Sequence, residues 1–368
     1  MSEFIIKEDG ENVIIEECVS IETEITIPDN VTIIGEHAFS ACKKLMKIEI
    51  PSSVKIIEKG AFCDCINLLE VIIPDSVTEI KDSAFYGCIK LKRVKLSNSI
   101  EKVDSYLFYG CKDLTDIELP DGLIEIDKYA FSSCKSLESI IIPNTVTKIN
   151  LSAFSSCKRL NNINLPDELS YLGEGVFSGC EGLTEISIPN KIKTINDQTF
   201  QSCKSLKYVQ IPDFVESLGG YVFSGCENLE SINLPDTIKE IGSHCFSDCE
   251  RLKSINIPKN LVKVEDYTFN RCERLETITL HSGIKTIGES AFFGCKSLEH
   301  LEISAGITEI LYFAFRFCGS LTTVKIPDSV EKIDDGAFSG CHNIVLEVES
   351  GSYAETYAKE KEIKYVVF

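Results

Sequence analysis

Apolar residues recur along this 368-residue chain with a period of 23 residues, a length that fits neither one helix nor one strand. A typical unit reads Cys-x-x-Leu-x-x-Ile-x-Ile-Pro-Asp-x-Val-x-x-Ile-x-x-x-Ala-Phe-x-x and then returns to cysteine. Fourteen cysteines follow this spacing, from Cys42 to Cys341, and a phenylalanine precedes each of them by three residues, from Phe39 to Phe338. Such a period is typical of a solenoid, in which each unit forms one coil and packs on its neighbours.

Each unit predicts two short extended segments joined by turns. The Ile-x-Ile pair alternates as a half-buried strand does, and it ends at a proline, which cannot donate a ladder hydrogen bond. All eleven prolines of the chain occupy this one column. Pro-Asp fits a turn, because the ring fixes φ and the aspartate side chain bonds the backbone beyond it. Val-x-x-Ile predicts the second extended segment, and Ala-Phe-x-x-Cys predicts a tight helical turn that closes the coil.

The two ends of the chain depart from the repeat in ways that predict caps. Asp9-Gly10 lies between two apolar runs and indicates a hairpin over the first coil. At the other end, residues 345–348 break the strand register. Ser352 to Glu355 forms a capping box before a short helix that ends near residue 360, and residues 363–368 indicate a last strand. The predicted division is an N-terminal cap at 1–27, an array of about fourteen 23-residue repeats at 28–344, and a C-terminal cap at 345–368. Covered sheet edges predict a monomer.

The seventeen cysteines are compatible with a metal site, a disulfide framework or a packed interior column. Zinc ligands converge from closely spaced pairs, whereas here the period is 23 and Cys63 and Cys65 form the only tight pair. Identical residues in an in-register stack point their Cβ atoms in parallel, farther apart than the roughly 3.8 Å that a disulfide prefers. We therefore expect no metal and no cofactor, and we interpret the columns as a buried structural ladder of rings and free thiols. Its representative members are Phe85, Cys88, Phe131, Cys134, Phe154, Cys157, Phe200 and Cys203. The redox states of Cys18 and Cys63 stay open.

Composition and charge narrow the function further. Hydrophobic residues make up 43% of the chain and charged residues 26%, as in an ordinary folded protein. The net charge of −20 leaves no basic field for phosphates, so we expect no nucleic-acid partner. No apolar stretch approaches the roughly 18 residues of a membrane span, so we expect no membrane insertion. The chain contains no P-loop, G-x-S-x-G or H-E-x-x-H motif, and we therefore expect no enzyme.

The repeat resembles the 23-residue unit of the BspA-like leucine-rich-repeat family over about residues 25–345. It differs from the commoner leucine-rich repeat, because Thr145 stands where Asn or Cys would follow Leu137 and the cysteine instead precedes the leucine by three residues. The resemblance implies a curved right-handed superhelix with a parallel β-sheet on its concave face and short strands and turns on its convex face. It also implies a microbial protein at the cell surface or secreted, which binds a host or matrix protein. The chain as given shows no signal peptide or anchor, so a cytoplasmic location is the expectation if that chain is complete.

The outward positions of the predicted strands suggest where a ligand binds. If the Ile-x-Ile side chains point inward, the residues five and seven after each cysteine point outward. These positions carry mixed charges in the first four repeats and become largely neutral from Ser139 onward. Solenoids bind on their concave face, and tyrosine is favoured at contact hot spots. The sequence thus predicts a ligand-binding strip of Asn162, Asn164, Tyr208, Gln210, Asn233 and Asn256. The alternative is that these polar residues only solvate an exposed sheet.

The leading functional prediction is a non-catalytic repeat scaffold that binds a protein ligand through its concave face, as an adhesin-type surface or secreted module does. One alternative is an intracellular structural or interaction scaffold without a dedicated strip. Another is a carbohydrate-binding module that uses Asn and Tyr side chains together. The identity of the ligand does not follow from the sequence.

Overall fold

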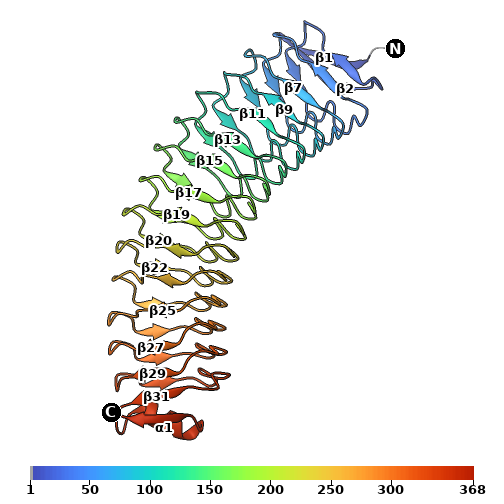
Figure 1. Cartoon of the computed structure of the whole chain (residues 1–368). Coiled ribbons are helices and arrows are strands. Elements are labelled where there is room, and N and C mark those ends of the chain that lie inside the picture. Colours follow the sequence, from blue (N-terminus) through green and yellow to red (C-terminus); the bar gives the residue numbers. More distant parts are fainter. Residues whose placement is uncertain (1–2) are drawn as a thin grey trace. The chain divides into compact units, whose positions relative to one another are not determined.

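The computed structural model describes residues 3–368, which form two compact units that meet in sequence between Leu183 and Thr184. Each unit is a β-solenoid whose coils carry parallel strands, as the repeat predicts (Figure 1). Residues 1 and 2, which belong to the predicted N-terminal cap, lie outside the described residues. The boundaries predicted at residues 27 and 344 stay a prediction.

Unit 1 begins with a hairpin and continues with two ladders of strands. Its hairpin strands are β1 (Phe4–Asp9) and β2 (Asn12–Cys18). Its long strands are β3 (Glu24–Thr26), β5 (Lys47–Glu49), β7 (Glu70–Ile72), β9 (Arg93–Lys95), β11 (Asp116–Glu118), β13 (Ser139–Ile141) and β15 (Asn162–Asn164). Its short strands are β4 (Ile33–Ile34), β6 (Ile56–Ile57), β8 (Glu79–Ile80), β10 (Lys102–Val103), β12 (Glu125–Ile126), β14 (Lys148–Ile149) and β16 (Tyr171–Leu172).

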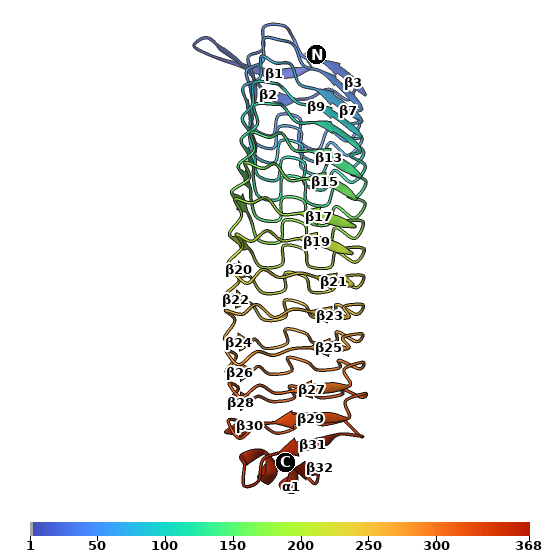
Figure 2. The ribbon, with the colours of Figure 1, turned by 60° about the vertical axis from the view of Figure 1, so that its left-hand side comes forward.

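Unit 2 has the same two ladders and ends with a helix and a strand. Its long-strand ladder contains β17 (Glu185–Ser187), β19 (Tyr208–Gln210), β21 (Ser231–Ile232), β23 (Ser254–Ile255), β25 (Thr277–Ile278), β27 (His300–Glu302), β29 (Thr323–Ile326), β31 (Val345–Val348) and β32 (Lys364–Val367). Its short strands are β18 (Thr194–Ile195), β20 (Ser217–Leu218), β22 (Glu240–Ile241), β24 (Lys263–Val264), β26 (Thr286–Ile287), β28 (Glu309–Ile310) and β30 (Lys332–Ile333). The helix α1 (Tyr353–Glu360) precedes β32. Figure 2 shows the short strands of this unit along one side and its long strands along the other.

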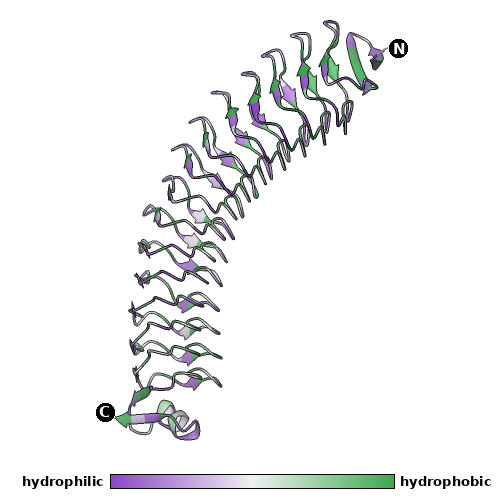
Figure 3. Cartoon of the chain, turned by 45° about the vertical axis from the view of Figure 1, so that its right-hand side comes forward, coloured by the Kyte–Doolittle hydropathy of each residue, from purple (hydrophilic) through white to green (hydrophobic). Residues whose placement is uncertain are grey.

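Strands of neighbouring coils pair in register, so that a residue lies opposite the residue 23 positions later in the sequence. In unit 1, for example, Asp116 lies opposite Arg93 in a parallel pair, and in unit 2 Tyr208 lies opposite Glu185. The middle residue of each three-residue strand points inward and its two neighbours point outward, as in β15, where Ile163 is buried between two exposed residues. Hydrophobic and hydrophilic residues accordingly alternate along the coils (Figure 3). This alternation confirms the predicted inward and outward positions.

A column of stacked phenylalanine rings forms the core of each unit. In unit 1 the rings of Phe62 and Phe85 stack with centroids 5.2 Å apart, and in unit 2 those of Phe223 and Phe246 lie 5.4 Å apart. All four rings are completely buried. A buried phenylalanine contributes roughly 1.5–3 kcal/mol relative to an exposed one. No coil can bury its ring alone, so each coil depends on the next.

The ladder cysteines do more than fill space between the rings. The Cys88 thiol donates a hydrogen bond to the Phe62 carbonyl oxygen at 3.2 Å, and the Cys249 thiol donates to the Phe223 carbonyl oxygen at the same distance. The same bond recurs along both units, always to the phenylalanine 26 residues earlier. The sequence interpretation of these residues as small hydrophobes is therefore incomplete, because each thiol also satisfies a buried carbonyl group of the preceding coil.

The segment around each phenylalanine is a run of turns rather than the helical turn that the sequence predicts. In the coil around Phe62, the Cys63 amide donates to the Gly60 carbonyl, and the Phe62 amide donates to the Ala84 carbonyl of the next coil at 2.8 Å. Two residues per coil adopt positive φ, such as Ser152 (52°) and Ser156 (59°). A left-handed residue interrupts a helix, and it directs alternate amides toward the neighbouring coil. Turn-to-turn bonds therefore add a third connection between coils, beside the two strand ladders.

The predicted caps are present at both ends. Strands β1 and β2 form an antiparallel hairpin, and β2 pairs in parallel with β4 of the first coil. Ser352 accepts a hydrogen bond from the Glu355 amide at the start of α1, and the Glu355 carboxylate accepts one from the Gly351 amide at 2.7 Å. Strand β32 then pairs in parallel with β31. Strands β29 and β31 are related by 22 residues instead of 23, which is the register change that the sequence indicates.

Candidate binding surface on the long strands

We call the outward side of the long strands in each unit the long-strand face. Asn162 and Asn164 lie on this face of unit 1, at the two exposed positions of β15. On unit 2, Tyr208 and Gln210 occupy the exposed positions of β19, with Tyr208 55% exposed. Asn233 and Asn256 are exposed directly after β21 and β23. All six residues of the predicted strip are thus solvent-accessible, two on unit 1 and four on unit 2.

Asn256 has a structural task that the sequence does not reveal. Its side-chain oxygen accepts a hydrogen bond from the Leu234 amide at 3.0 Å, and its side-chain nitrogen donates to the Leu234 carbonyl at 2.6 Å. In an ordinary coil the equivalent amide bonds a backbone carbonyl, as the Ile188 amide does with Gln210 at 3.0 Å. The Asn256 side chain therefore replaces backbone pairing at this position, and its amide is occupied by the fold.

Two adjoining hollows lie beside β19 in unit 2. The first has a volume of about 410 Å³, and its lining includes Tyr208, Gln210 and Asn233 of the predicted strip. The second has a volume of about 610 Å³. Phe214, which is 60% exposed, lines both. Sequence reasoning missed Phe214, although the signal was present, because it is the only apolar residue in its column of the repeat.

The first long strands of unit 1 carry charges that pair with one another. Arg93 on β9 contacts Asp116 on β11 with 3.0 Å between Nε and Oδ2, and Lys47 contacts Glu49 within β5 at 3.0 Å. Hydrogen bonds from Lys47 and Thr26 lower the pKa of Glu49. These side chains bind each other across an exposed sheet, so they offer fewer unsatisfied groups to a ligand than the neutral residues of β19.

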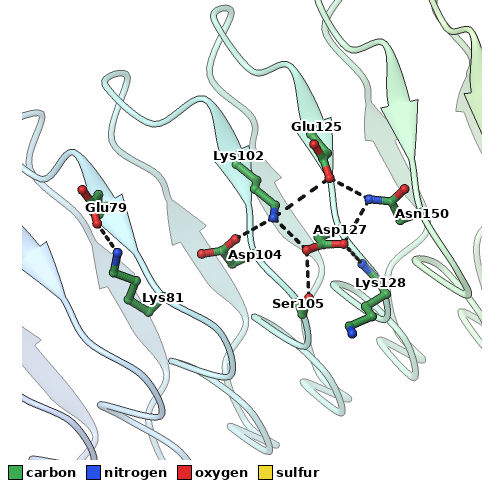
Figure 4. A network of polar contacts seen from close by, with 9 residues as sticks. All are labelled: Glu79, Lys81, Lys102, Asp104, Ser105, Glu125, Asp127, Lys128 and Asn150. Carbon is green, nitrogen blue, oxygen red and sulfur yellow. Dashed lines mark hydrogen bonds and ion pairs between the residues drawn. The ribbon is translucent and has the colours of Figure 1, made fainter.

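A denser polar network covers the short strands of unit 1 (Figure 4). The Lys102 ammonium lies 2.8 Å from the Asp127 carboxylate and 3.2 Å from the Asp104 carboxylate. Burial alone would lower the pKa of Lys102, but the hydrogen bonds to Asp127 and Asp104 raise it overall. Burial likewise would raise the pKa of Asp127, yet hydrogen bonds from Lys102, the Lys128 amide and Ser105 lower it overall. Asn150 also donates to Asp127 at 3.0 Å, so this network links three coils and serves the fold.

The structure places the predicted ladder residues in the core. Phe85, Cys88, Phe131, Cys134, Phe154, Cys157, Phe200 and Cys203 are all completely buried. Burial raises the pKa of Cys157 to about 12. Cys42 and Cys63 are only half-buried, and a hydrogen bond with the Cys42 thiol lowers the pKa of Cys18 to about 7. Interior thiols such as Cys157 are therefore protonated at neutral pH, whereas Cys18 has the lowered pKa of a reactive thiol. A hydrogen bond with the Cys318 thiol also lowers the pKa of Cys341.

The described residues contain neither a candidate metal cluster nor a membrane-spanning helix. Across residues 3–368, no group of three or more His, Cys, Asp or Glu side chains is arranged to hold a metal ion. Within the same range, no helix has the length and apolar character that crossing a bilayer requires.

Coils of 23 residues with parallel strands and a buried ring column define a repeat solenoid of the leucine-rich-repeat class. The sequence profile described as "BspA type Leucine rich repeat region" matches residues 12–135, 101–230 and 216–345, in six copies. The chain therefore belongs to the BspA-type leucine-rich-repeat family. Proteins of this family are protein-interaction scaffolds.

Solved bacterial structures are similar over nearly the whole chain. A leucine-rich repeat protein from Bacteroides ovatus is 28% identical with a TM-score of 0.78, and the alignment covers 100% of this chain and 99% of that one. A leucine rich cell surface protein from Faecalibacterium prausnitzii is 27% identical with a TM-score of 0.55, over 96% of this chain and 97% of that one. A leucine-rich repeat protein from Eubacterium ventriosum, at 23% identity and a TM-score of 0.54 over 92% and 93%, shares the fold. A search of curated proteins found no match.

Proposed function

We propose that the protein is a non-catalytic scaffold that binds a protein ligand through its long-strand face, with the main contacts on unit 2. The observation that carries the proposal is the exposure of Tyr208 at the edge of a hollow that Gln210 and Asn233 also line. A large aromatic ring beside uncommitted amides is typical of contact hot spots, because it supplies area at a low cost in side-chain entropy. On unit 1, Asn162 and Asn164 offer two further exposed amides on the long-strand face.

The chemistry of the long-strand face supports this choice of surface. The outward residues of β21, β23 and β25 include Ser231, Ser254 and Thr277, which are neutral and exposed. A neutral face loses little when water leaves it, whereas the paired charges on β5 and β9 must first give up their partners or their hydration. The neutral part of the face is therefore the better surface for a protein ligand.

We further propose that the protein acts as a monomer at the surface of a microbe or after secretion. Membership of the BspA-type family supports this location, and the similar protein from Faecalibacterium prausnitzii is described as a cell surface protein. The ends support the monomer, because the β1–β2 hairpin covers the edge at β4, and α1 packs against β30, the last short strand.

The test is direct binding to a panel of purified extracellular-matrix proteins, measured by surface plasmon resonance with the whole chain. We expect one or more of them to bind, and the Tyr208→Ala and Asn233→Ala substitutions together to weaken that binding about tenfold or more. Thr277→Ala, on the same face but away from the hollow, is the matched control and leaves affinity unchanged. Equal affinity of the double variant and wild type would place the ligand on another surface.

A further inference from the structure

One repeat of unit 2 carries two aromatic residues in columns that hold no other phenylalanine or tyrosine. Tyr208 stands five residues after its cysteine, where the other repeats have charged, hydroxyl, amide or imidazole side chains. Phe214 stands eleven residues after the same cysteine. The equivalent residues are Asn30, Ser53, Ser76, Ser99, Gly122, Thr145, Glu168, Lys191, Thr237, Asn260, Gly283, Gly306 and Ser329. The repeat itself therefore gives no reason for a ring at either position.

The fold uses the Phe214 column for a hydrogen bond that phenylalanine cannot make. The Ser76 hydroxyl donates to the Val54 carbonyl at 2.8 Å, and the Thr237 hydroxyl donates to the Val215 carbonyl at 2.7 Å. Phe214 gives up this bond between coils and leaves its ring 60% exposed. An exposed aromatic ring, in a column that bonds the neighbouring coil in several other repeats, is a candidate contact for a ligand.

The hollow next to both rings is lined by side-chain amides. Asn190, Gln210 and Asn233 border it together with Tyr208 and Phe214. In the described part of the chain, no hydrogen bond engages the amides of Asn190 and Asn233, and Gln210 only accepts one from Ser187 at 3.4 Å. An amide both donates and accepts, as a hydroxyl group does. Three amides around two exposed rings therefore suit a ligand that combines hydroxyl groups with a flat apolar side.

The hollow on the other side of Phe214 adds a positive charge. Its lining holds three lysines and two carboxylates, and one of these lysines, Lys239, lies 2.8 Å from the Glu216 carboxylate. The charge of Lys193 helps to lower the pKa of Glu216, but among residues 3–368 no carboxylate lies within 4.0 Å of the Lys193 ammonium. The chain as a whole carries a net charge of −20, which repels a ligand with many negative charges. A ligand with a single carboxylate matches Lys193 without that repulsion.

We propose that Tyr208, Phe214 and Lys193 form a saccharide-binding subsite for an oligosaccharide that ends in one acidic sugar, such as a sialic or uronic acid. The apolar face of a sugar ring lies on the aromatic side chains, its hydroxyl groups bond the three amides, and its carboxylate pairs with Lys193. Both hollows are open, which suits a sugar ring that lies flat on an exposed aromatic side chain. The proposal goes beyond the protein-binding function, since Phe214 and Lys193 lie outside the strip.

Isothermal titration of the whole chain with sialyllactose, a glucuronic-acid-terminated disaccharide and lactose tests this subsite. We expect one of the acidic sugars to bind about tenfold more tightly than neutral lactose. Phe214→Ser, which restores a residue that the column carries elsewhere, abolishes binding of the acidic sugar while the circular dichroism spectrum stays unchanged. Lys193→Gln reduces acidic binding to the level of lactose. Tyr312→Ser, at another exposed aromatic residue of unit 2, is the control and changes nothing.

Three results would overturn the subsite. The first is no heat from any of the sugars at millimolar concentration, and the second is equal binding by wild type and Phe214→Ser. The third is binding of a short polyglutamate peptide with the same dependence on Phe214 and Lys193, which would assign the hollows to an acidic peptide. Matrix-protein binding that survives Phe214→Ser but not the substitutions at Tyr208 and Asn233 would separate this proposal from the protein-binding function.

Discussion

Along the long strands, the inward residues keep the same chemical type from repeat to repeat, whereas the outward residues vary. In β19 of unit 2, Val209 is 2% exposed, and its neighbour Tyr208 is 55% exposed. The inward position is aliphatic in every repeat, because each coil must present the same apolar surface to the next. The outward positions range from Arg93 in unit 1 to Tyr208 in unit 2. The fold thus depends on columns that scarcely vary, and recognition is free to change on columns that carry no coil-to-coil packing.

The outward residues also differ in whether they already have interaction partners on the surface. On β9 and β11 of unit 1 they form an ion pair between Arg93 and Asp116, so their charges are already compensated. Beside β19 of unit 2 they surround hollows and leave amides uncommitted. Surface charges that pair with one another contribute to solubility. Surface amides without a hydrogen-bond partner in the fold are available to a ligand. The experiments below test this division between interior, self-paired and open positions.

Alkaline pH gives the largest effect that we predict, and it acts only on the interior. Burial raises the pKa of Cys157 to about 12, and it also raises the pKa of most other ladder thiols, such as Cys134. Between the unfolded value near 8.5 and these folded values, the folded state holds more protons, so stability falls as pH rises. From pH 8.5 to 9.5 each thiol whose folded pKa is raised in this way loses about 1 kcal/mol of stabilisation, and these losses add along the ladder. Urea unfolding at several pH values measures this loss.

The matched variant for this titration is Cys157→Ala, which removes one buried thiol. Its unfolding free energy falls less steeply between pH 8.5 and 9.5 than that of wild type, by about 1 kcal/mol. A stability that stays constant over this pH range would show that the thiols are ionised or exposed in the folded protein.

The second-largest effect that we predict is the loss of stability when a single interior phenylalanine ring is removed. Phe246 stacks between Phe223 and Phe269 at centroid distances of 5.4 and 5.6 Å, and it is completely buried. Phe246→Ala removes these contacts and leaves a cavity, so we expect a loss of about 3–5 kcal/mol in urea unfolding. Phe214→Ala, at an exposed ring of the same unit, changes stability by about 0.5 kcal/mol or less. Similar losses in the two variants would contradict the division between interior and surface.

The polar network on the short strands of unit 1 ranks third. Lys102→Met removes the cation that Asp104 and Asp127 share, and we expect a loss of about 1 kcal/mol at neutral pH, because the network stays partly hydrated. The lowered pKa of Asp127 stabilises the fold above the unfolded pKa near 3.9, and this contribution disappears as pH falls through the folded value. The variant therefore has a higher Asp127 pKa, which a carboxyl NMR titration measures, and it loses less stability than wild type on acidification. An unchanged Asp127 pKa would argue against the network.

The self-paired surface of unit 1 gives the smallest effect. Exposed ion pairs contribute little, because water and salt screen both charges. Arg93→Ala should leave the urea midpoint within experimental error and leave ligand binding intact. A clear loss of binding in this variant would move the recognition surface from unit 2 to the charged strands of unit 1.

Much of the fold follows from the sequence, because one period fixes both the strand positions and the direction of each side chain. The Ile-x-Ile pair gave the long strands, and Ser352 with Glu355 gave the start of α1. The backbone conformation of the turns was harder to predict from the sequence. The sequence predicted a helical turn before each cysteine, but positive φ at residues such as Ser152 directs alternate amides to the next coil instead. Serine is common in many conformations, so its identity does not signal this geometry.

The candidate site was only partly predictable for a related reason. Outward positions follow from alternation, which is why Tyr208 and Asn233 were found. The hydrogen bonds of Asn256 to Leu234 depend on the exact approach of two coils, and a side-chain amide looks the same in sequence whether it binds backbone or solvent. Phe214 was not predicted, because it lies outside the strands and the alternation rule does not apply to it. A comparison of every column of the repeat would have shown that it is the only aromatic member of its column.

Thiol titration tests the central claim, that identical coils bury one common interior, most directly. With an aromatic disulfide reagent at neutral pH, we predict that the folded protein reacts at no more than four thiols, which are the half-buried Cys42 and Cys63 and the two with lowered pKa values, Cys18 and Cys341. All seventeen cysteines react once urea unfolds the chain. Reaction of most of the seventeen in the folded protein would mean that the ladder lies open to solvent, and the account of a shared interior would be wrong.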